Sequence, residues 1–364
     1  MKLYRLGTHT KEIVVSEIPQ IYEDTNKDQL IQTKSLIDKC PMKLWEKSKK
    51  KHNDYEYIYT SSKRDLNVCS INPVSRSYFK LYEMIIDFHL LKSNIFCACL
   101  AEGPGGFIHC LNDFSYRQEY DIHRCYGITL YSSDRKIPYW NQLIVKNKKN
   151  ILSYGRDKTG DLYKLENTLH FIQQVGDNFC HLVTADGGFD YSEDYNKQEI
   201  SSYKLLYSEI YVALHIQKQT GNFVLKVFDL FNYQTIQLIY LLYTCYSIIE
   251  FYKPLTSRLS NSEKYVICSG FLGCPDEVKE LLTQSFETCE SFFINIPPSF
   301  LEEMSHYNQL FTQSQIKKIQ EILASCKQEK VQLPMKGQID NAKRWCELYK
   351  LPIHSKCIYL IQKE

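Results

Sequence analysis

The alternation of two residue patterns between residues 75 and 270 constrains the fold more than any other feature of the chain. Short β-rich runs take turns with amphipathic segments, which is typical of a parallel sheet whose strands are joined by crossover helices. The expected strands are Ile95–Leu100, Cys125–Leu130, Asn150–Tyr154, Cys180–Ala185, Phe223–Phe228 and Tyr265–Ser269. The expected helices are Ser77–Lys92 with Ser77 as its cap, Leu162–Gln174, Glu199–Lys218 and Tyr233–Tyr246. This pattern predicts an α/β fold with a doubly wound sheet and helices on both faces.

Two flanking regions lack this alternation. Residues 1–70 are polar and irregular, and the region beyond 275 is dominated by helix-like segments at Asp276–Phe293 and Ser299–Gln328. We therefore expect an N-terminal extension over 1–70, the α/β domain over 71–275 and a mostly helical C-terminal extension over 276–364. The N-terminal lysines either form an ordinary solvated face or contact RNA phosphates. They are Lys39, Lys43, Lys47, Lys49, Lys50 and Lys51.

Composition excludes several classes of protein. The net charge of +2 is not that of a histone-like cation, so affinity for nucleic acid would have to come from local basic patches. The 14 cysteines lack the paired spacing of a zinc site, and the N-terminus lacks a basic-then-apolar signal. The longest apolar stretch, Ile236–Phe251, is short for a membrane span and is expected to be a buried helix. We expect no metal, free thiols and a reducing compartment, cytoplasmic or nuclear, or the host cytoplasm or virion for a viral protein.

A glycine-rich turn directly follows the expected strand Ile95–Leu100 and precedes a helical pattern. Ligands of doubly wound folds bind at the carboxyl ends of strands, where glycines let the backbone approach a ligand closely. The turn contains neither G-x-G-x-x-G nor G-x-x-x-x-G-K, which disfavours a dinucleotide or a nucleoside triphosphate. A tight turn without a ligand remains the alternative. The turn consists of Ala101, Glu102, Gly103, Pro104, Gly105, Gly106 and Phe107.

A single lysine, Lys226, interrupts the apolar strand Phe223–Phe228. Removing an ammonium group from water is so costly that a buried strand seldom keeps an unpaired lysine. Lys226 therefore needs a functional role, a carboxylate partner or a position at the sheet edge. Asp186 ends the expected strand Cys180–Ala185, which places its carboxylate at the carboxyl edge of the sheet, near the glycine turn. An Asx turn before Gly187 is the alternative for this aspartate.

The sequence AEGPGGF after a first strand resembles the S-adenosylmethionine loop of the FtsJ-like RNA 2′-O-ribose methyltransferases. Gly127–Leu130 resembles the end of the family's second strand beside the cofactor ribose, and Gly160–Leu162 resembles the acidic turn that receives the adenine amino group. Asp157 competes with Asp161 for that role, and an exposed turn with capping aspartates is a further alternative. The resemblance covers residues 72–270 and implies a Rossmann-like methyltransferase sheet with S-adenosyl-L-methionine as cofactor. The implied cofactor-binding residues are Glu102, Gly103, Pro104, Gly105, Gly106, Phe107, Leu130, Asp161 and Asp186.

Four segments resemble those that carry the family's catalytic tetrad: residues 76–81, 184–188, 221–228 and 258–265. The tetrad residues that this resemblance implies are Lys80, Asp186, Lys226 and Glu263. In the implied reaction the ribose 2′ oxygen attacks the sulfonium methyl group in line, so the protein must align the groups and remove or weaken the 2′ proton. By resemblance Lys226 activates the hydroxyl, Asp186 and Glu263 hold Lys226, and Lys80 assists. A lysine can serve in removing this proton if neighbouring cations and desolvation lower its pKa toward neutrality. Taken singly, Lys80 and Glu263 would be an ordinary solvated lysine and a turn glutamate.

The implied substrate is the 5′ end of capped mRNA, with the capping or transcription machinery as candidate partner and no membrane. The long flanks and the wide insertion between Ile128 and Asp161 resemble mRNA cap enzymes of eukaryotes and large DNA viruses. A ribosomal or transfer RNA 2′-O-methyltransferase is one alternative, and a noncatalytic RNA-binding or scaffolding subunit is another. A cap site needs aromatic or apolar faces for the methylguanine. Candidate rings, each with simple helix packing as the alternative, are Tyr191, Tyr195, Tyr203 and Tyr207.

Overall fold

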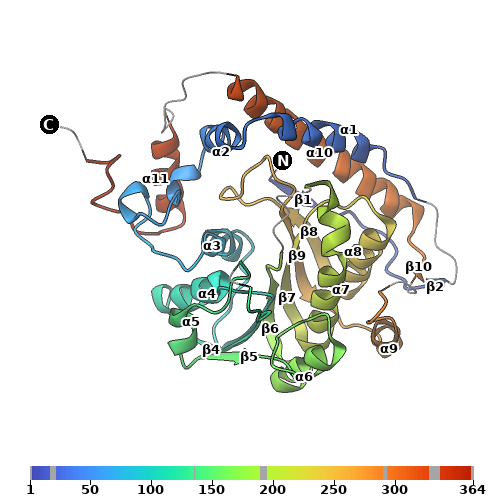
Figure 1. Ribbon diagram of the computed structural model, residues 1–364. Coiled ribbons are helices and arrows are strands. Elements are labelled where there is room, and N and C mark those ends of the chain that lie inside the picture. The colour runs from blue at the N-terminus through green and yellow to red at the C-terminus, as the bar shows by residue number, and fades with distance from the viewer. Residues whose placement is uncertain are drawn as a thin grey trace.

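An eight-stranded sheet forms the centre of the molecule (Figure 1). The computed structural model describes residues 2–16, 22–134, 136–188, 195–289, 293–327 and 337–361. In spatial order the strands are β1 (Leu3–Arg5), β8 (Tyr246–Tyr252), β9 (Lys264–Phe271), β7 (Gln217–Val227), β6 (Cys180–Ala185), β3 (Ile95–Leu100), β4 (Ile122–Ile128) and β5 (Asn150–Ser153).

The strand directions locate the crevice where a ligand can bind. The five strands from β7 to β5 are parallel, whereas β9 runs antiparallel to both of its neighbours, β7 and β8. From β3 the chain moves outward through β4 to β5 and then returns to the other side of β3 as β6. The direction of winding therefore reverses between β3 and β6, and ligands of doubly wound folds bind at the carboxyl ends of the strands at such a point.

Helices cover both faces of the sheet, so the buried side chains form two large cores. One core lies under α6 (Leu165–Val175), α7 (Gln198–Ile216) and α8 (Tyr233–Cys245). The other lies under α3 (Ser77–Asp87), α4 (Gly106–Arg117), α5 (Gln142–Lys146) and α11 (Gln338–Leu348). Along β3 the side chains alternate between the two cores, since Cys97 and Cys99 belong to one and Ala98 and Leu100 to the other.

The two flanking regions pack against each other as well as against the sheet. Helix α1 (Asn26–Ser35) lies along α10 (Pro298–Cys326), and α2 (Met42–Lys51) lies beside the C-terminal part of α10 (Figure 1). A third buried cluster joins these helices and includes Leu30, Trp45 and Ile319. Outside the large sheet, β2 (Val15–Ser16) pairs with β10 (Phe293–Ile294). Helix α9 (Asp276–Gln284) follows β9 in the sequence and precedes β10.

The structure confirms the α/β class and all six expected strands, and it corrects several other expectations. Residues 1–70 are not irregular, because they contain α1, α2 and several short helical turns. The stretch Ile236–Phe251 is not one helix, because α8 ends at Cys245 and the remainder is strand β8. A fully apolar run gives no periodicity by which helix and strand can be told apart. Ser77 is the first helical residue of α3 rather than its cap, and the expected helix Asp276–Phe293 ends at Gln284.

Candidate active site

The four implied tetrad residues reach the carboxyl edge of the sheet from four different elements. Lys80 lies on α3, Asp186 follows β6, Lys226 lies near the end of β7 and Glu263 directly precedes β9. The elements bring them together as two ion pairs, Lys226 with Asp186 and Lys80 with Glu263. All four side chains are between 10% and 14% exposed, so both pairs are largely withdrawn from solvent but can still be reached.

Asp186 is held from two neighbouring strands. The Lys226 Nζ donates a hydrogen bond to the backbone oxygen of Asp186 at 2.7 Å and lies 3.2 Å from its Oδ1. Tyr265, whose Cα is the register partner of Lys226 across β7 and β9, donates its hydroxyl hydrogen bond to the same Oδ1 at 2.8 Å. The lysine inside an apolar strand thus has the carboxylate partner that its burial requires.

Glu263 anchors the second pair. Its Oε2 accepts a hydrogen bond from Lys80 Nζ at 2.7 Å, and its Oε1 accepts one from Ser257 Oγ at 2.7 Å. Lys253 donates to the backbone oxygen of Glu263 and, at 2.8 Å, to the backbone oxygen of Asn261. The loop between β8 and β9 is therefore fixed by its own side chains, which determines where the Glu263 carboxylate lies.

The alternating charges stabilise the ionised forms of these groups. Burial alone would raise the pKa of the Glu263 carboxyl group, but the charges of Lys80 and Lys226 outweigh burial and hold this pKa below its usual value. Burial alone would lower the pKa of the Lys226 ammonium group, but Asp186 and Glu263 outweigh it and raise this pKa. The Lys226 pKa is therefore not lowered toward neutrality, because two carboxylates face this lysine.

The glycine turn connects β3 to the N-terminus of α4. Gly105 has a φ of 106°, a left-handed conformation that favours glycine, and α4 begins at Gly106. A Cβ on Gly103, Gly105 or Gly106 would meet Pro138, Ile144 or the hydroxyls of Ser75 and Ser77, respectively. These glycines thus allow the turn to pack closely against neighbouring protein segments, a role that the sequence did not indicate.

Two other residues of the turn are buried. The Glu102 carboxyl group is 3% exposed, and burial followed by the nearby Asp186 charge raises its pKa well above its usual value. Its Oε1 accepts a hydrogen bond from the Phe107 amide, whereas its Oε2 has no hydrogen-bond partner among the described residues. The Phe107 ring belongs to the core and packs against Tyr265, with 6.2 Å between the ring centroids. The turn is therefore linked to the residues that hold Asp186.

The remaining implied cofactor residues lie at the ends of β4 and β5. Leu130 lies two residues after the end of β4, and the next residue, Tyr131, donates its amide to the backbone oxygen of Thr159 at 2.7 Å. Asp157 uses both carboxylate oxygens within its own turn, on Thr159 and on Lys164. Asp161 accepts a hydrogen bond from the Tyr163 amide through Oδ1. Its Oδ2 accepts none from the residues that the structure describes. This difference favours Asp161 over Asp157 as the residue available to a ligand.

The structure does not support Tyr203 and Tyr207 as rings for a cap. Tyr207 is 1% exposed, donates its hydroxyl hydrogen bond to the Leu282 backbone at 2.8 Å and contacts Phe286. Tyr203 packs against the same core, so helix packing, the alternative considered for both rings, holds. Tyr191 and the side chain of Tyr195 lie outside the described residues.

Sequence reasoning missed three residues that hold Asp186 and Glu263, namely Tyr265, Ser257 and Lys253, and it missed Glu209, a buried carboxyl group that interacts electrostatically with Lys226. Tyr265 could have been found, because it follows Glu263 by two residues on an expected strand. Glu209 lies on a helix far from the tetrad in sequence, and nothing in its neighbourhood indicates that its carboxyl group faces this edge of the sheet.

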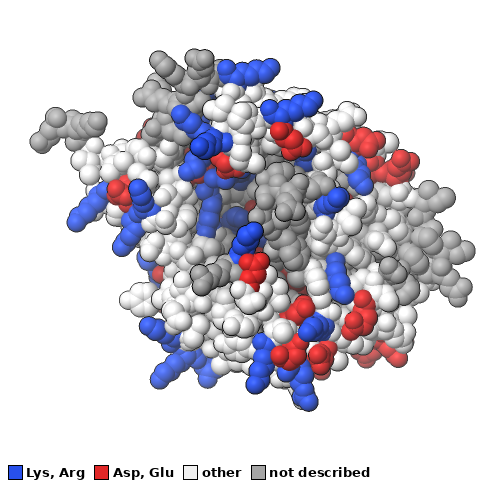
Figure 2. All heavy atoms as spheres, in the orientation of Figure 1, with Lys and Arg blue, Asp and Glu red and all other residues white. Residues whose placement is uncertain are grey.

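The lysine-rich N-terminal stretch lies on α2 and the turn before it. Figure 2 shows Lys and Arg side chains at the end of the molecule where α2 lies, and Lys43 and Lys47 are exposed there. On the side facing the site, Arg76 and Arg258 contact the fully buried Glu56 carboxylate, at 3.5 Å and 2.9 Å. Two guanidinium groups against one carboxylate leave an excess of positive charge beside the tetrad.

Comparison with known proteins agrees with this geometry. The model of the FtsJ-like methyltransferase family matches residues 73–271. The cap-specific mRNA (nucleoside-2′-O-)-methyltransferase 1 of Mus musculus is 30% identical over 289 residues, which are 71% of this chain and 32% of the relative. The Xenopus laevis protein of the same name is 28% identical over 296 residues, or 75% of this chain and 33% of the relative. The Trypanosoma brucei brucei protein of that name is 34% identical over 189 residues, or 51% and 49%.

The chain spans about a third of the length of the two vertebrate relatives. Within it, the family match includes the glycine turn and all four residues of the two ion pairs. The order of the strands, the turn after β3 and the matched residues lead to one conclusion: this chain belongs to the FtsJ-like methyltransferase family.

Proposed function

We propose that this chain transfers a methyl group from S-adenosyl-L-methionine to a ribose 2′ oxygen near the 5′ end of capped mRNA. The observation that carries the proposal is the meeting of two lysines and two carboxylates at the carboxyl edge of the sheet, beside the turn after β3. The relatives are cap-specific mRNA methyltransferases by name, which supports a capped mRNA as the substrate. A ribosomal or transfer RNA substrate and a noncatalytic RNA-binding role remain the competing proposals.

The residues at the switch point fit the proposed cofactor. The buried Glu102 Oε2 and Thr184 Oγ1 have no hydrogen-bond partners among the described residues, so polar atoms are available beside the turn. Asp161 has carboxylate capacity for an amino group, and Asp186 presents a negative charge that suits a sulfonium. When bound, the cofactor supplies a methyl group on a good leaving group.

Lys226 is the residue we propose to act on the ribose. An ammonium group has three N–H donors, and the contacts with Asp186 occupy two of them. The third donor can hold the 2′ oxygen and stabilise the negative charge that develops on it as its proton passes to a solvent water molecule. Asp186 and Tyr265 fix the direction of Lys226, while Lys80 and Glu263 add a second fixed charge pair beside the ribose.

RNA can approach over the N-terminal helices. A hollow of about 430 Å³, part of it open to solvent, lies between α2, α10 and the loop before Glu263, and its lining includes Lys49, Ser262 and Gln315. Lysines on this side would contact RNA phosphates and so place the first nucleotides at the ion pairs.

The test is methyl transfer from radiolabelled S-adenosyl-L-methionine to capped, uncapped and structured RNAs. We expect transfer to capped RNA only, and a loss of about 10²–10³-fold in Lys226→Ala, the range for removal of one donor that stabilises a developing oxyanion. The matched control is Lys218→Ala, at the other end of the same strand, where the lysine is exposed and we expect normal rates. Equal transfer to uncapped RNA would remove the cap proposal, and RNA binding without any transfer would favour the noncatalytic role.

A further inference from the structure

The Arg258 guanidinium group is bound along one edge and free along the other. Arg258 lies in the loop between β8 and β9, five residues before Glu263. Its Nε and Nη2 donate to the two oxygens of the Glu56 carboxylate, at 3.2 Å and 2.9 Å. Its Nη1 has no hydrogen-bond partner among the described residues, and the side chain is 27% exposed. The edge formed by Nη1 and Nη2 can therefore donate to two oxygens of a further anion.

Glu56, in the N-terminal extension, fixes this orientation from the interior. Its carboxylate is fully buried and also accepts hydrogen bonds from Asn53 Nδ2 at 2.7 Å and from Thr60 Oγ1 at 3.3 Å. Burial alone would raise the pKa of Glu56, but the charges of Arg76 and Arg258 outweigh burial and lower this pKa. The ionised carboxylate holds the guanidinium group in one place, so little side-chain freedom is lost when a ligand binds.

Arg76 adds a second cation and connects this cluster to the tetrad. It caps the N-terminus of α3, one helical turn before Lys80, so the two side chains lie on the same face of the helix. Its Nη1 lies 3.5 Å from Glu56 Oε1, and its Nη2 donates to the backbone oxygen of Thr256 at 3.2 Å. Burial lowers the pKa of the Arg76 guanidinium group, and the charges of Glu56 and Glu263 offset part of this lowering. The cluster therefore adjoins the second ion pair of the tetrad.

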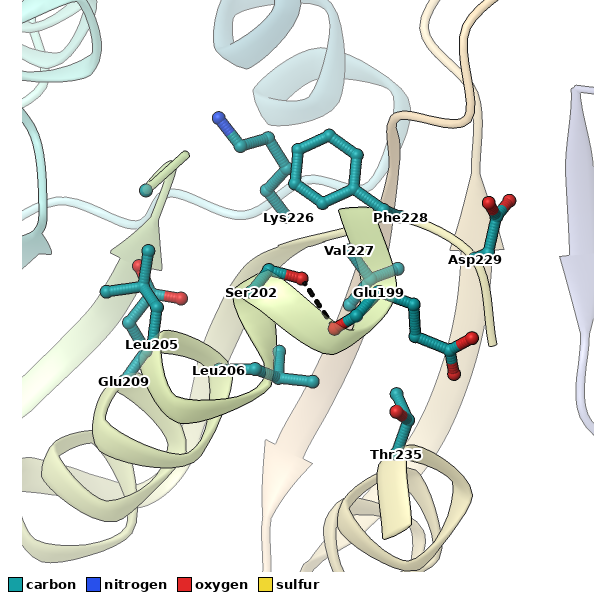
Figure 3. Close-up of a pocket in the computed structure, with 11 residues that line it drawn as sticks. Glu199, Ser202, Leu205, Leu206, Glu209, Lys226, Val227, Phe228, Asp229 and Thr235 are labelled. Carbon is teal, nitrogen blue, oxygen red and sulfur yellow. Dashed lines mark hydrogen bonds between the residues drawn. The ribbon is translucent and has the colours of Figure 1, made fainter. Parts of the chain in front are cut away.

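The proposed substrate brings phosphates to this edge of the sheet. In RNA the carbon next to the one that bears the 2′ hydroxyl carries the 3′ phosphate, so a ribose at Lys226 places an anion close to the reacting oxygen. The Lys226 side chain points away from Glu199 and Asp229 (Figure 3). Lys226 and Lys80 already pair with carboxylates, whereas the two arginines share a single carboxylate. Free donors for a phosphate therefore remain on Arg258.

We propose that Arg258, oriented by Glu56 and accompanied by Arg76, binds a backbone phosphate of the substrate RNA through its free guanidinium edge. This inference rests on the proposed function, because it requires an RNA ribose at Lys226. A capped RNA offers two sources of this phosphate. One is the triphosphate bridge on the 5′ side of the first nucleotide, and the other is the diester on its 3′ side.

The experiment compares Arg258→Gln and Arg258→Lys with a matched control, Arg117→Gln. Arg117 ends α4, far along that helix from the glycine turn; its side chain is 32% exposed and pairs with Asp113 at 2.7 Å. Fluorescence anisotropy of a labelled, capped, single-stranded RNA over a salt series gives the Kd and its salt dependence. We expect Arg258→Gln to raise the Kd about 10-fold, since a hydrogen-bonded charge is lost. The slope of log affinity against log salt should fall by about 0.7, the value for one phosphate contact to a single strand.

Arg258→Lys separates a lost contact from a distorted loop. It keeps the positive charge but not the fork of donors, so we expect the wild-type salt slope and a Kd raised by only about threefold. Arg117→Gln should leave both quantities within about twofold of the wild type. A Kd and slope of Arg258→Gln that match those of Arg117→Gln would overturn the proposal. A weaker affinity with an unchanged slope would also overturn it, because distortion alone removes no phosphate contact.

Two short competitors identify the source of the phosphate. A capped dinucleotide contains the triphosphate bridge and no 3′ phosphate, whereas a capped trinucleotide contains both. Weaker competition by the trinucleotide alone in Arg258→Gln would assign Arg258 to the 3′ diester, and equal weakening of both would assign it to the bridge. Unchanged competition by both would refute the site. These measurements need no catalysis, so a wild type that binds RNA but transfers no methyl group would contradict the proposed function and leave the phosphate site to be decided by binding.

Discussion

At the scale of single residues, the four largely buried charges of the tetrad are tolerated because each one has a partner of opposite sign. Lys226 could be predicted to need such a partner from its apolar strand alone, and Asp186 could be predicted to lie at the same sheet edge. The sign of the pKa shift could not be predicted, because it depends on how near Glu263 and Glu209 come to the ammonium group. These distances are set by a loop and by a helix whose placement the sequence pattern does not specify.

The buried carboxyl group of Glu209 should make folding stability depend on pH. Its pKa is about 8 in the folded protein and near 4.5 in the unfolded chain, so the folded state holds one more proton between these values. Stability from this group is therefore complete below about pH 4.5 and is lost as the pH rises toward 8, with a slope of up to about 1.4 kcal/mol per pH unit.

Chemical denaturation of the wild type and of Glu209→Gln between pH 5 and pH 9 measures this effect, because other titrating groups cancel in the difference. We expect the wild type to lose stability relative to the variant as the pH rises. A difference that stays constant with pH would show that Glu209 titrates at its ordinary value.

At the scale of elements, the N-terminal helices are joined to the end of β7 by a buried ion pair. Lys34 on α1 lies 2.8 Å from Asp229, three residues after Lys226, and both side chains are under 10% exposed. The Asp229 carboxylate also interacts electrostatically with Lys264, at the start of β9. The pair therefore couples α1 to the ends of the two strands that carry Lys226 and Tyr265, and the polarity of residues 1–70 gave no sign of this.

Replacing Lys34 by methionine should destabilise the protein strongly. The variant leaves Asp229 buried without its nearest cation, which costs about 3–5 kcal/mol when one partner of a buried pair is removed. Urea denaturation provides the measurement. Lys27→Met, on the same helix but in a half-buried position, should change the free energy of unfolding by less than about 0.5 kcal/mol. Equal effects of the two substitutions would argue against the importance of the pair.

At the scale of the whole molecule, the sequence allowed the parallel strands to be predicted, but it did not allow strands β8 and β1, at one side of the sheet, to be predicted. Alternating patterns and the turn after Ile95–Leu100 identify β3, β4, β5, β6 and β7, and the residues at their carboxyl ends follow from the topology. Strand β8 was hidden in a uniformly apolar run, and β1 is three residues long and pairs with a strand about 245 residues away. Such pairing is decided by tertiary packing, which local patterns do not record.

Although the net charge is only +2, exposed lysines gather on α2, so RNA binding should depend on the salt concentration. We expect the double substitution Lys43→Ala with Lys47→Ala on α2 to weaken the binding of capped and uncapped RNA alike. Each lost phosphate contact should reduce the slope of log affinity against log salt by about 1. Fluorescence anisotropy over a salt series measures this slope. Lys146→Ala with Lys148→Ala, exposed lysines in and beside α5, is the matched control, and an equal loss there would mean that the face on α2 has no special role.

The antiparallel strand β9 lies between β7 and β8, both of which precede it in the chain. During synthesis on the ribosome, β7 and β8 therefore emerge before the strand that must enter between them, and the tyrosine that steadies Asp186 arrives with that strand. A nascent chain that stops short of residue 271 would already contain Lys226 but would lack a completed sheet around it. The residues of the two ion pairs are therefore held together only once β9 has been inserted between β7 and β8.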